Sequence, residues 1–172
     1  LWVNLITDSF PAFSLGLEPK EEGVMDKAPR NPDEPIIDKR MRVALPIQSI
    51  TLALAAYLSF LYGHSIEIYP NSMDTARTCA FVTLSVGELL RAYSARSETK
   101  PLHKMKIFAN YYLNISVVIS LALLVGVVYI PFLQPIFHTV GLVKSELGIV
   151  LAFALIPLIG GEFGKLITKK ME

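Results

Sequence analysis

The chain has 172 residues, of which 52% are hydrophobic and 18% charged, and its mean hydropathy is +0.47. This hydrophobic content is higher than the core of a soluble domain requires, so the composition excludes an ordinary soluble protein and favours a membrane protein. The net charge of +1 does not indicate a nucleic-acid partner, and the single Cys79 excludes a disulfide within the chain.

The first apolar segment, residues 1–17, is shorter than the roughly 20 residues that a helix needs to cross about 30 Å of hydrocarbon. It lacks the charged start and the cleavage site of a signal peptide. We therefore interpret it as the C-terminal part of a spanning helix. Residues 18–40, with four prolines and charges of both signs, predict an extended cytoplasmic loop, either a linker or a docking strip for a cytoplasmic domain.

Four further segments are long and apolar enough to span a bilayer, over about residues 41–62, 75–94, 107–131 and 146–167. Spans of this kind form helices, because an open sheet would leave backbone groups unpaired in hydrocarbon. The sequence therefore predicts an all-α, polytopic transmembrane helix bundle with one partial helix and four spanning helices. The four-helix transmembrane domain would cover residues 41–172.

Lys and Arg are concentrated in alternate connections of this bundle. Six lie within residues 20–42 and five within 91–106, whereas residues 63–73 have none and residues 132–144 have only Lys144. Connections rich in Lys and Arg remain in the cytoplasm, so residues 20–42, residues 91–106 and the C-terminus are expected there. The chain is thus predicted to be a multi-pass integral membrane protein, in the plasma membrane if it is prokaryotic.

Three polar residues interrupt the first apolar segment at helical spacing. Asn4, Thr7 and Asp8 project from one helical face, and an Asp in the membrane costs about 2.5–3.5 kcal/mol unless it lines a cavity or an ion path. Their oxygens suit a hard cation such as Ca²⁺, and Pro11 frees backbone carbonyls nearby. The alternative is that Asn4 and Thr7 only hydrogen-bond a neighbouring helix.

Glu88 is a second candidate metal ligand, because it is a carboxylate inside the predicted span 75–94. Its alternative roles are an ion pair with Arg91, three residues on, or an extension of the side chain toward the interface.

Other polar residues in the spans favour structural roles. Glu162 lies close to the cytoplasmic end of its span beside Lys165, which favours either an extension of the side chain toward the interface or an ion pair. Asn110 and Asn114 favour hydrogen bonds between helices. The sequence has no Gly-rich phosphate cradle and no soluble segment long enough for a nucleotide, so the chain alone is not expected to couple ATP to transport.

Two adjacent motifs carry a family resemblance. The opening WVNLITDSFPAFSLGLEP resembles the end of the sixth transmembrane helix of P-type cation-transporting ATPases of the calcium-pump type. MDKAPRNPDEPI, residues 25–36, resembles the loop between their sixth and seventh helices. SVGELLRAYSARSE, residues 85–98, resembles the eighth helix, and VLAFALIPLIGGEFGK, residues 150–165, resembles the tenth. The resemblance therefore covers nearly the whole chain.

This resemblance implies cation coordination by Asn4, Thr7 and Asp8, with Asp8 shared between two Ca²⁺ sites. Glu88 matches the eighth-helix ligand of sarcoplasmic-reticulum-type pumps. The phosphorylated Asp and the domains that bind ATP and Mg²⁺ would precede Leu1, so we expect a fragment that is inactive alone and has no catalytic residues.

The function that the resemblance implies is that of the C-terminal transport region of an ATP-driven Ca²⁺ translocase. Its partners would be the N-terminal helices and cytoplasmic domains of the same pump, together with the bilayer. The alternatives are a related pump for Mn²⁺, Na⁺ or H⁺, or a non-enzymatic helical packing domain in the membrane.

Overall fold

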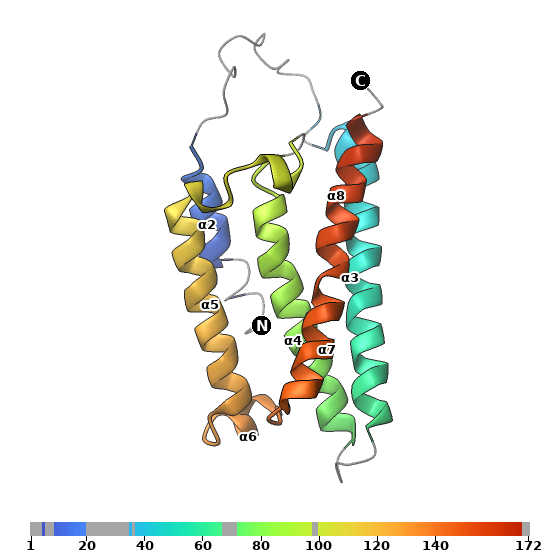
Figure 1. The fold of residues 1–172 in the computed structure, drawn as a ribbon, viewed down its shortest axis with the longest axis vertical. Helices are drawn as coiled ribbons and strands as arrows, with labels where there is room; N and C mark the ends of the chain where they lie inside the picture. Colours follow the sequence, from blue (N-terminus) through green and yellow to red (C-terminus); the bar gives the residue numbers. More distant parts are fainter. Residues whose placement is uncertain are drawn as a thin grey trace.

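A computed structural model describes residues 5, 9–19, 35, 37–66, 72–97 and 100–169. These residues form helices and short connections, with no strand among them, which confirms the predicted all-α class (Figure 1). Three described helical stretches are long and apolar enough to cross a membrane, and they cover Lys39–Ser65, Tyr111–Tyr129 and Lys144–Thr168, the last with a break at Leu155. The fold is therefore a membrane helix bundle.

The first three helices of the described residues are α2 (Phe10–Gly16), α3 (Lys39–Ser65) and α4 (Ser72–Ser94). α3 begins at Lys39 because the Asp38 carboxylate accepts a hydrogen bond of 2.7 Å from the Met41 backbone N–H, which would otherwise lack a partner in the first turn. α4 has 23 residues but contains Asp74 and Arg91 near its ends as well as Glu88. It is therefore the most polar of the long helices.

α5 (Tyr111–Tyr129) begins later than the sequence predicts. Residues 107–109 were expected to start the span, but they form a 3₁₀ turn, as do Leu102–Lys104. The side chain of Asn110 caps α5 by accepting a hydrogen bond of 2.9 Å from the Leu113 N–H. Asn favours this capping position, so it fixes the start of the helix at residue 111.

The predicted span 146–167 is interrupted in the structure. It follows the short α6 (Gln134–Phe137) and consists of α7 (Lys144–Ala154) and α8 (Ile156–Lys169), which are separated at Leu155. Pro157 has no backbone N–H to continue the ladder across this point. The proline therefore explains why one long apolar segment forms two helices.

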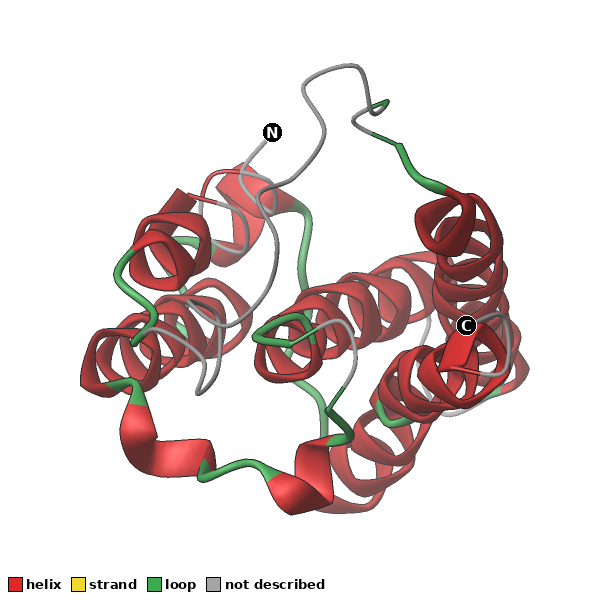
Figure 2. Cartoon of the chain, turned by 90° about the horizontal axis from the view of Figure 1, so that it is seen from above, coloured by secondary structure: helices red, strands yellow, loops and turns green. Residues whose placement is uncertain are grey.

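α4 lies in the centre of the bundle (Figure 1). It packs against α3, α7 and α8 on one side and against α5 and the end of α2 on the other, and α2 packs against α5. Viewed from above, the long helices run roughly side by side (Figure 2). Val86 belongs to an apolar cluster with residues of α5 and α7, and Leu89 belongs to another with α5 and Leu15 of α2.

Two glycines allow α3 to approach its neighbours closely. A Cβ atom at Gly63 would lie 2.7 Å from the Ala76 Cα of α4, and a Cβ atom at Gly160 of α8 would lie 2.5 Å from the Thr51 side chain. Real Cβ atoms essentially never come so near another heavy atom, so only glycine fits at these two crossings.

Candidate functional site

Three of the four predicted metal ligands, Asn4, Thr7 and Asp8, lie outside the described residues. The fourth, Glu88, is described. The site is therefore built from Glu88 and from α2, which begins two residues after Asp8.

Glu88 lines a cavity between α4 and α2, which we call the Glu88 cavity. Its volume is about 220 Å³, and Pro11, Ala12 and Leu15 of α2 form the facing wall. On α4 the lining continues one and two turns beyond Glu88, with Arg91, Ala92 and Ala95. The glutamate is half-buried. The structure thus places this carboxylate opposite the helix that follows the predicted ligands.

The chemistry of the described donors fits part of a cation site. Ca²⁺ takes six to eight oxygen ligands, and one carboxylate supplies at most two of them. Among the described residues, no group of three or more His, Cys, Asp or Glu side chains is gathered in a way that would hold a metal ion. Glu88 therefore supplies at most part of a coordination shell, and further oxygens would have to complete it.

The position of α2 next to this cavity is fixed by a polar cluster beyond the end of the helix, which we call the Glu18 cluster. Arg96 donates hydrogen bonds of 2.7 and 2.9 Å to Glu18 Oε1 and of 3.0 Å to Oε2. The same guanidinium donates to the backbone carbonyls of Lys106 and Ile107, at 3.0 and 2.9 Å. Asn110 donates to Glu18 at 2.7 Å. The cluster thus joins α2, the end of α4 and the start of α5.

The protonation of Glu18 reflects these contacts. Burial raises the pKa of the Glu18 carboxyl, but hydrogen bonds from Arg96 and Asn110 and the charge of Arg96 outweigh burial and leave the pKa below the ordinary value of 4.5. Glu18 is therefore ionised near neutral pH, and its pairing with Arg96 is a contact between full charges.

A second polar cluster, the Glu162 cluster, lies between the ends of α4 and α8. Glu162 accepts hydrogen bonds from the Ser94 hydroxyl at 2.6 Å, from the Leu102 N–H at 2.8 Å and from Lys165 at 2.9 Å. Lys165 also donates to the carbonyl oxygens of Ser94 and Lys100, at 2.7 and 3.2 Å. The predicted ion pair of Glu162 with Lys165 is confirmed.

The two asparagines that the sequence assigns to contacts between helices make such contacts. Asn110 donates a hydrogen bond of 2.8 Å to the Ser14 carbonyl of α2, and Asn114 accepts one of 3.0 Å from the Tyr93 hydroxyl of α4. Both predictions are confirmed.

Sequence reasoning did not predict the Glu18 cluster. Glu18 and Arg96 are 78 residues apart, and neither has a partner at helical spacing that would indicate the pair. Within the sequence alone, the only signal was that both residues are charged and lie next to a predicted span.

The whole chain is similar to known membrane transport proteins. Residues 1–167 match the family described as the C-terminus of cation-transporting ATPases. A calcium-transporting ATPase of Bacillus subtilis is 34% identical over 99% of the chain and 19% of the relative. Calcium-transporting ATPase 1 of Bacillus cereus is 33% identical over 98% of the chain and 20% of the relative. Calcium-transporting ATPase 1 of Saccharomyces cerevisiae is 31% identical over 99% of the chain and 18% of the relative.

These matches confirm the resemblance that the motifs indicate. The chain spans about a fifth of the length of the relatives, so most of each relative lies outside the matched region.

Proposed function

Because the chain belongs to the family of cation-transporting ATPase C-termini, we propose that it is the membrane transport region of an ATP-driven Ca²⁺ pump. The relatives are named calcium-transporting ATPases, which supports Ca²⁺ as the transported ion. ATP and Mg²⁺ act in the rest of the pump, whose N-terminal helices and cytoplasmic domains are the partners of this region.

The role of this region is to supply part of the cation site within the membrane. The observation that carries this proposal is that Glu88 and α2 line one cavity. Asn4, Thr7 and Asp8 immediately precede α2, so their oxygens and the Glu88 carboxylate complement each other in a partial coordination shell. Ligands from the remainder of the pump complete it.

The distribution of charge supports a cytoplasmic C-terminus. The start of α3 and the ends of α4 and α8 lie at the same end of the bundle (Figure 1). Basic residues accumulate at all three of these positions, including Arg40, Arg96 and Lys165. By the positive-inside rule, this end faces the cytoplasm, and in a prokaryote the membrane is the plasma membrane.

The experiment that tests this function is Asp8→Asn in the full-length protein. The substitution removes a negative charge from the proposed site, so we expect it to abolish Ca²⁺-dependent phosphorylation by ATP. The matched control is Asp74→Asn, since Asp74 lies at the far end of α4 in an exposed pair with Arg77. If phosphorylation of Asp8→Asn depended on Ca²⁺ as it does in the unmodified protein, the proposal would be contradicted.

Glu88→Gln tests the contribution of α4 to the same site. Loss of this carboxylate should lower the number of Ca²⁺ ions bound per pump, measured by equilibrium binding of radioactive Ca²⁺. An unchanged number of bound ions would show that Glu88 has a structural role only.

A further inference from the structure

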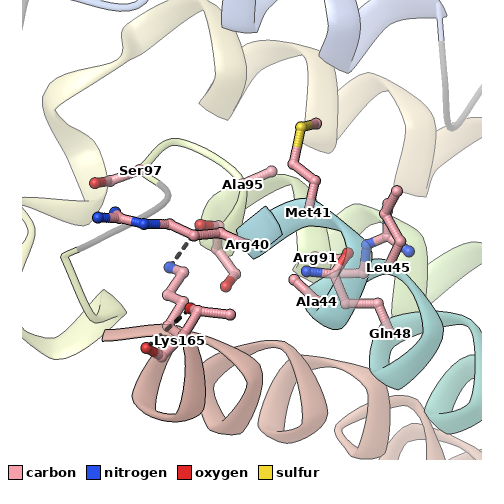
Figure 3. Close-up of a pocket in the computed structure, with 11 residues that line it drawn as sticks. Arg40, Met41, Ala44, Leu45, Gln48, Arg91, Ala95, Ser97 and Lys165 are labelled. Carbon is pink, nitrogen blue, oxygen red and sulfur yellow. Dashed lines mark hydrogen bonds between the residues drawn. The ribbon is translucent and has the colours of Figure 1, made fainter. Parts of the chain in front are cut away.

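A second cavity, which we call the basic cavity, lies where α3 begins and α4 and α8 end (Figure 3). Its volume is about 180 Å³, far more than the roughly 10–15 Å³ that one water needs. Among the described residues of the lining, three are basic, namely Arg40, Arg91 and Lys165, and none is acidic. This composition favours an anionic ligand.

Two side chains of the lining keep free donors within the described part of the chain. Lys165 is paired with Glu162, and the hydroxyls of Ser94 and Thr168 donate to oxygens of α8. By contrast, the side chains of Arg91 on α4 and Gln48 on α3 form no hydrogen bond or ion pair with another described residue. A guanidinium and a carboxamide therefore line the cavity from two helices. Guanidinium groups bind phosphate with two parallel hydrogen bonds.

Around Gln48, the α3 side of the lining is apolar, and it reaches the outer surface of the bundle at Leu45. Met41, Ala44 and Leu45 line the cavity from α3, and Leu45 is 41% exposed. In a helix long and apolar enough to span a bilayer, such a surface contacts acyl chains.

We propose that the basic cavity binds the headgroup of an anionic phospholipid. The phosphate accepts hydrogen bonds from Arg91 and Gln48, and the acyl chains lie along the apolar surface of α3. Basic pockets between transmembrane helices recognise lipid headgroups by this combination of charge and apolar contact. The inference requires that these helices span a bilayer but does not depend on which ion the pump transports.

The shared lining of the two cavities gives this ligand a consequence for the cation site. Arg91 and Ala95 line both the basic cavity and the Glu88 cavity. A phosphate that holds the Arg91 guanidinium in the basic cavity draws positive charge away from Glu88, and so favours a cation beside it.

The test is native mass spectrometry of the full-length protein titrated with phosphatidylglycerol or phosphatidylcholine. We expect the unmodified protein to retain phosphatidylglycerol preferentially. Arg91→Gln should weaken this retention about tenfold, the effect of losing one charged hydrogen bond, and Gln48→Leu should weaken it roughly threefold. The matched control is Arg77→Gln on the same helix, where the side chain is 62% exposed, and it should retain lipid normally.

A second measurement separates a lipid headgroup from a free anion. Inorganic phosphate is added to the protein in phosphatidylcholine nanodiscs, and the midpoint of thermal unfolding is recorded. Stabilisation by phosphatidylglycerol but not by inorganic phosphate supports the lipid site. Equal stabilisation by inorganic phosphate, or normal lipid retention by Arg91→Gln, overturns it. If Arg91→Gln unfolds at a lower temperature than the unmodified protein in phosphatidylcholine alone, Gln48→Leu on the facing helix is the deciding variant. In that case normal retention of phosphatidylglycerol by Gln48→Leu overturns the lipid site.

Discussion

The Glu18 and Glu162 clusters stabilise the same end of the bundle in different ways. In the Glu18 cluster the carboxylate binds Arg96, a residue 78 positions away, and the bond joins three elements. In the Glu162 cluster the carboxylate binds Lys165, three residues along the same helix, and contacts with Ser94 and Leu102 link this pair to the rest of the bundle. The first cluster therefore depends on the assembled fold, whereas the second contains a local pair.

This difference gives the two clusters different roles. The Glu18 cluster fixes the end of α2, and hence the helix that faces Glu88 across its cavity. The Glu162 cluster fixes the connection after α4 against α8. A change in the first should thus disturb the candidate cation site, and a change in the second should act mainly on the connection between α4 and α5.

The largest expected effect is that of Arg96→Ala. It leaves the Glu18 carboxylate and the carbonyls of Lys106 and Ile107 without the guanidinium, so we expect a loss of about 3 kcal/mol in the stability of this region. That value is at the low end for a broken buried pair because Glu18 is 21% exposed. Hydrogen exchange of the amides in residues 100–110 measures the loss.

The control for this substitution is Arg77→Ala, which removes an exposed arginine of α4. Exposed ion pairs contribute about 0–1 kcal/mol, so its exchange rates should stay close to those of the unmodified protein. Equal effects of the two substitutions would show that the Glu18 cluster does not stabilise the fold.

A smaller effect is expected from Glu162→Gln. The amide keeps the shape of the side chain but loses the charge that pairs with Lys165 and one of the acceptors used by Ser94 and Leu102. We expect a loss of about 1–2 kcal/mol, measured by hydrogen exchange of the Leu102 amide. Rapid exchange near α2 in this variant, with slow exchange at Leu102, would contradict the separate roles of the two clusters.

The smallest expected effect is a dependence on pH that distinguishes Glu18→Gln from the unmodified protein. Because the folded pKa of Glu18 lies below its ordinary value of 4.5, the ionised carboxylate stabilises the fold above that pH. This stabilisation is lost as the pH falls from 4.5 through the folded pKa. As the pH is lowered from 7, the midpoint of thermal unfolding should therefore fall less steeply in Glu18→Gln than in the unmodified protein. If the midpoint falls equally steeply with pH in both proteins, the Glu18 carboxylate does not contribute to the stability of the fold.

Features that depend on neighbouring residues could be predicted from the sequence. The apolar segments indicated the membrane helices because hydrocarbon requires long apolar helices, and the pair of Glu162 with Lys165 follows from helical spacing. The boundaries were less predictable. Apolar residues 107–109 looked like part of a span, but the cap formed by Asn110 starts the helix after them.

Contacts between distant segments could not be predicted. Nothing in the local pattern indicates that Arg96 meets Glu18, because the pair arises only when α2, α4 and α5 pack together. The same holds for the meeting of Glu88 with α2 at one cavity. The coordination by Asn4, Thr7 and Asp8 stays a prediction, since these residues lie outside the described part of the chain.

The glycines at the crossings of α3 have a mechanical consequence. At Gly63 and Gly160 there is no room for even one added carbon, so α3 is held tightly against α4 and α8. Sliding any of these helices would drive bulkier residues into the same gaps. We therefore expect α3, α4 and α8 to move together as one rigid body.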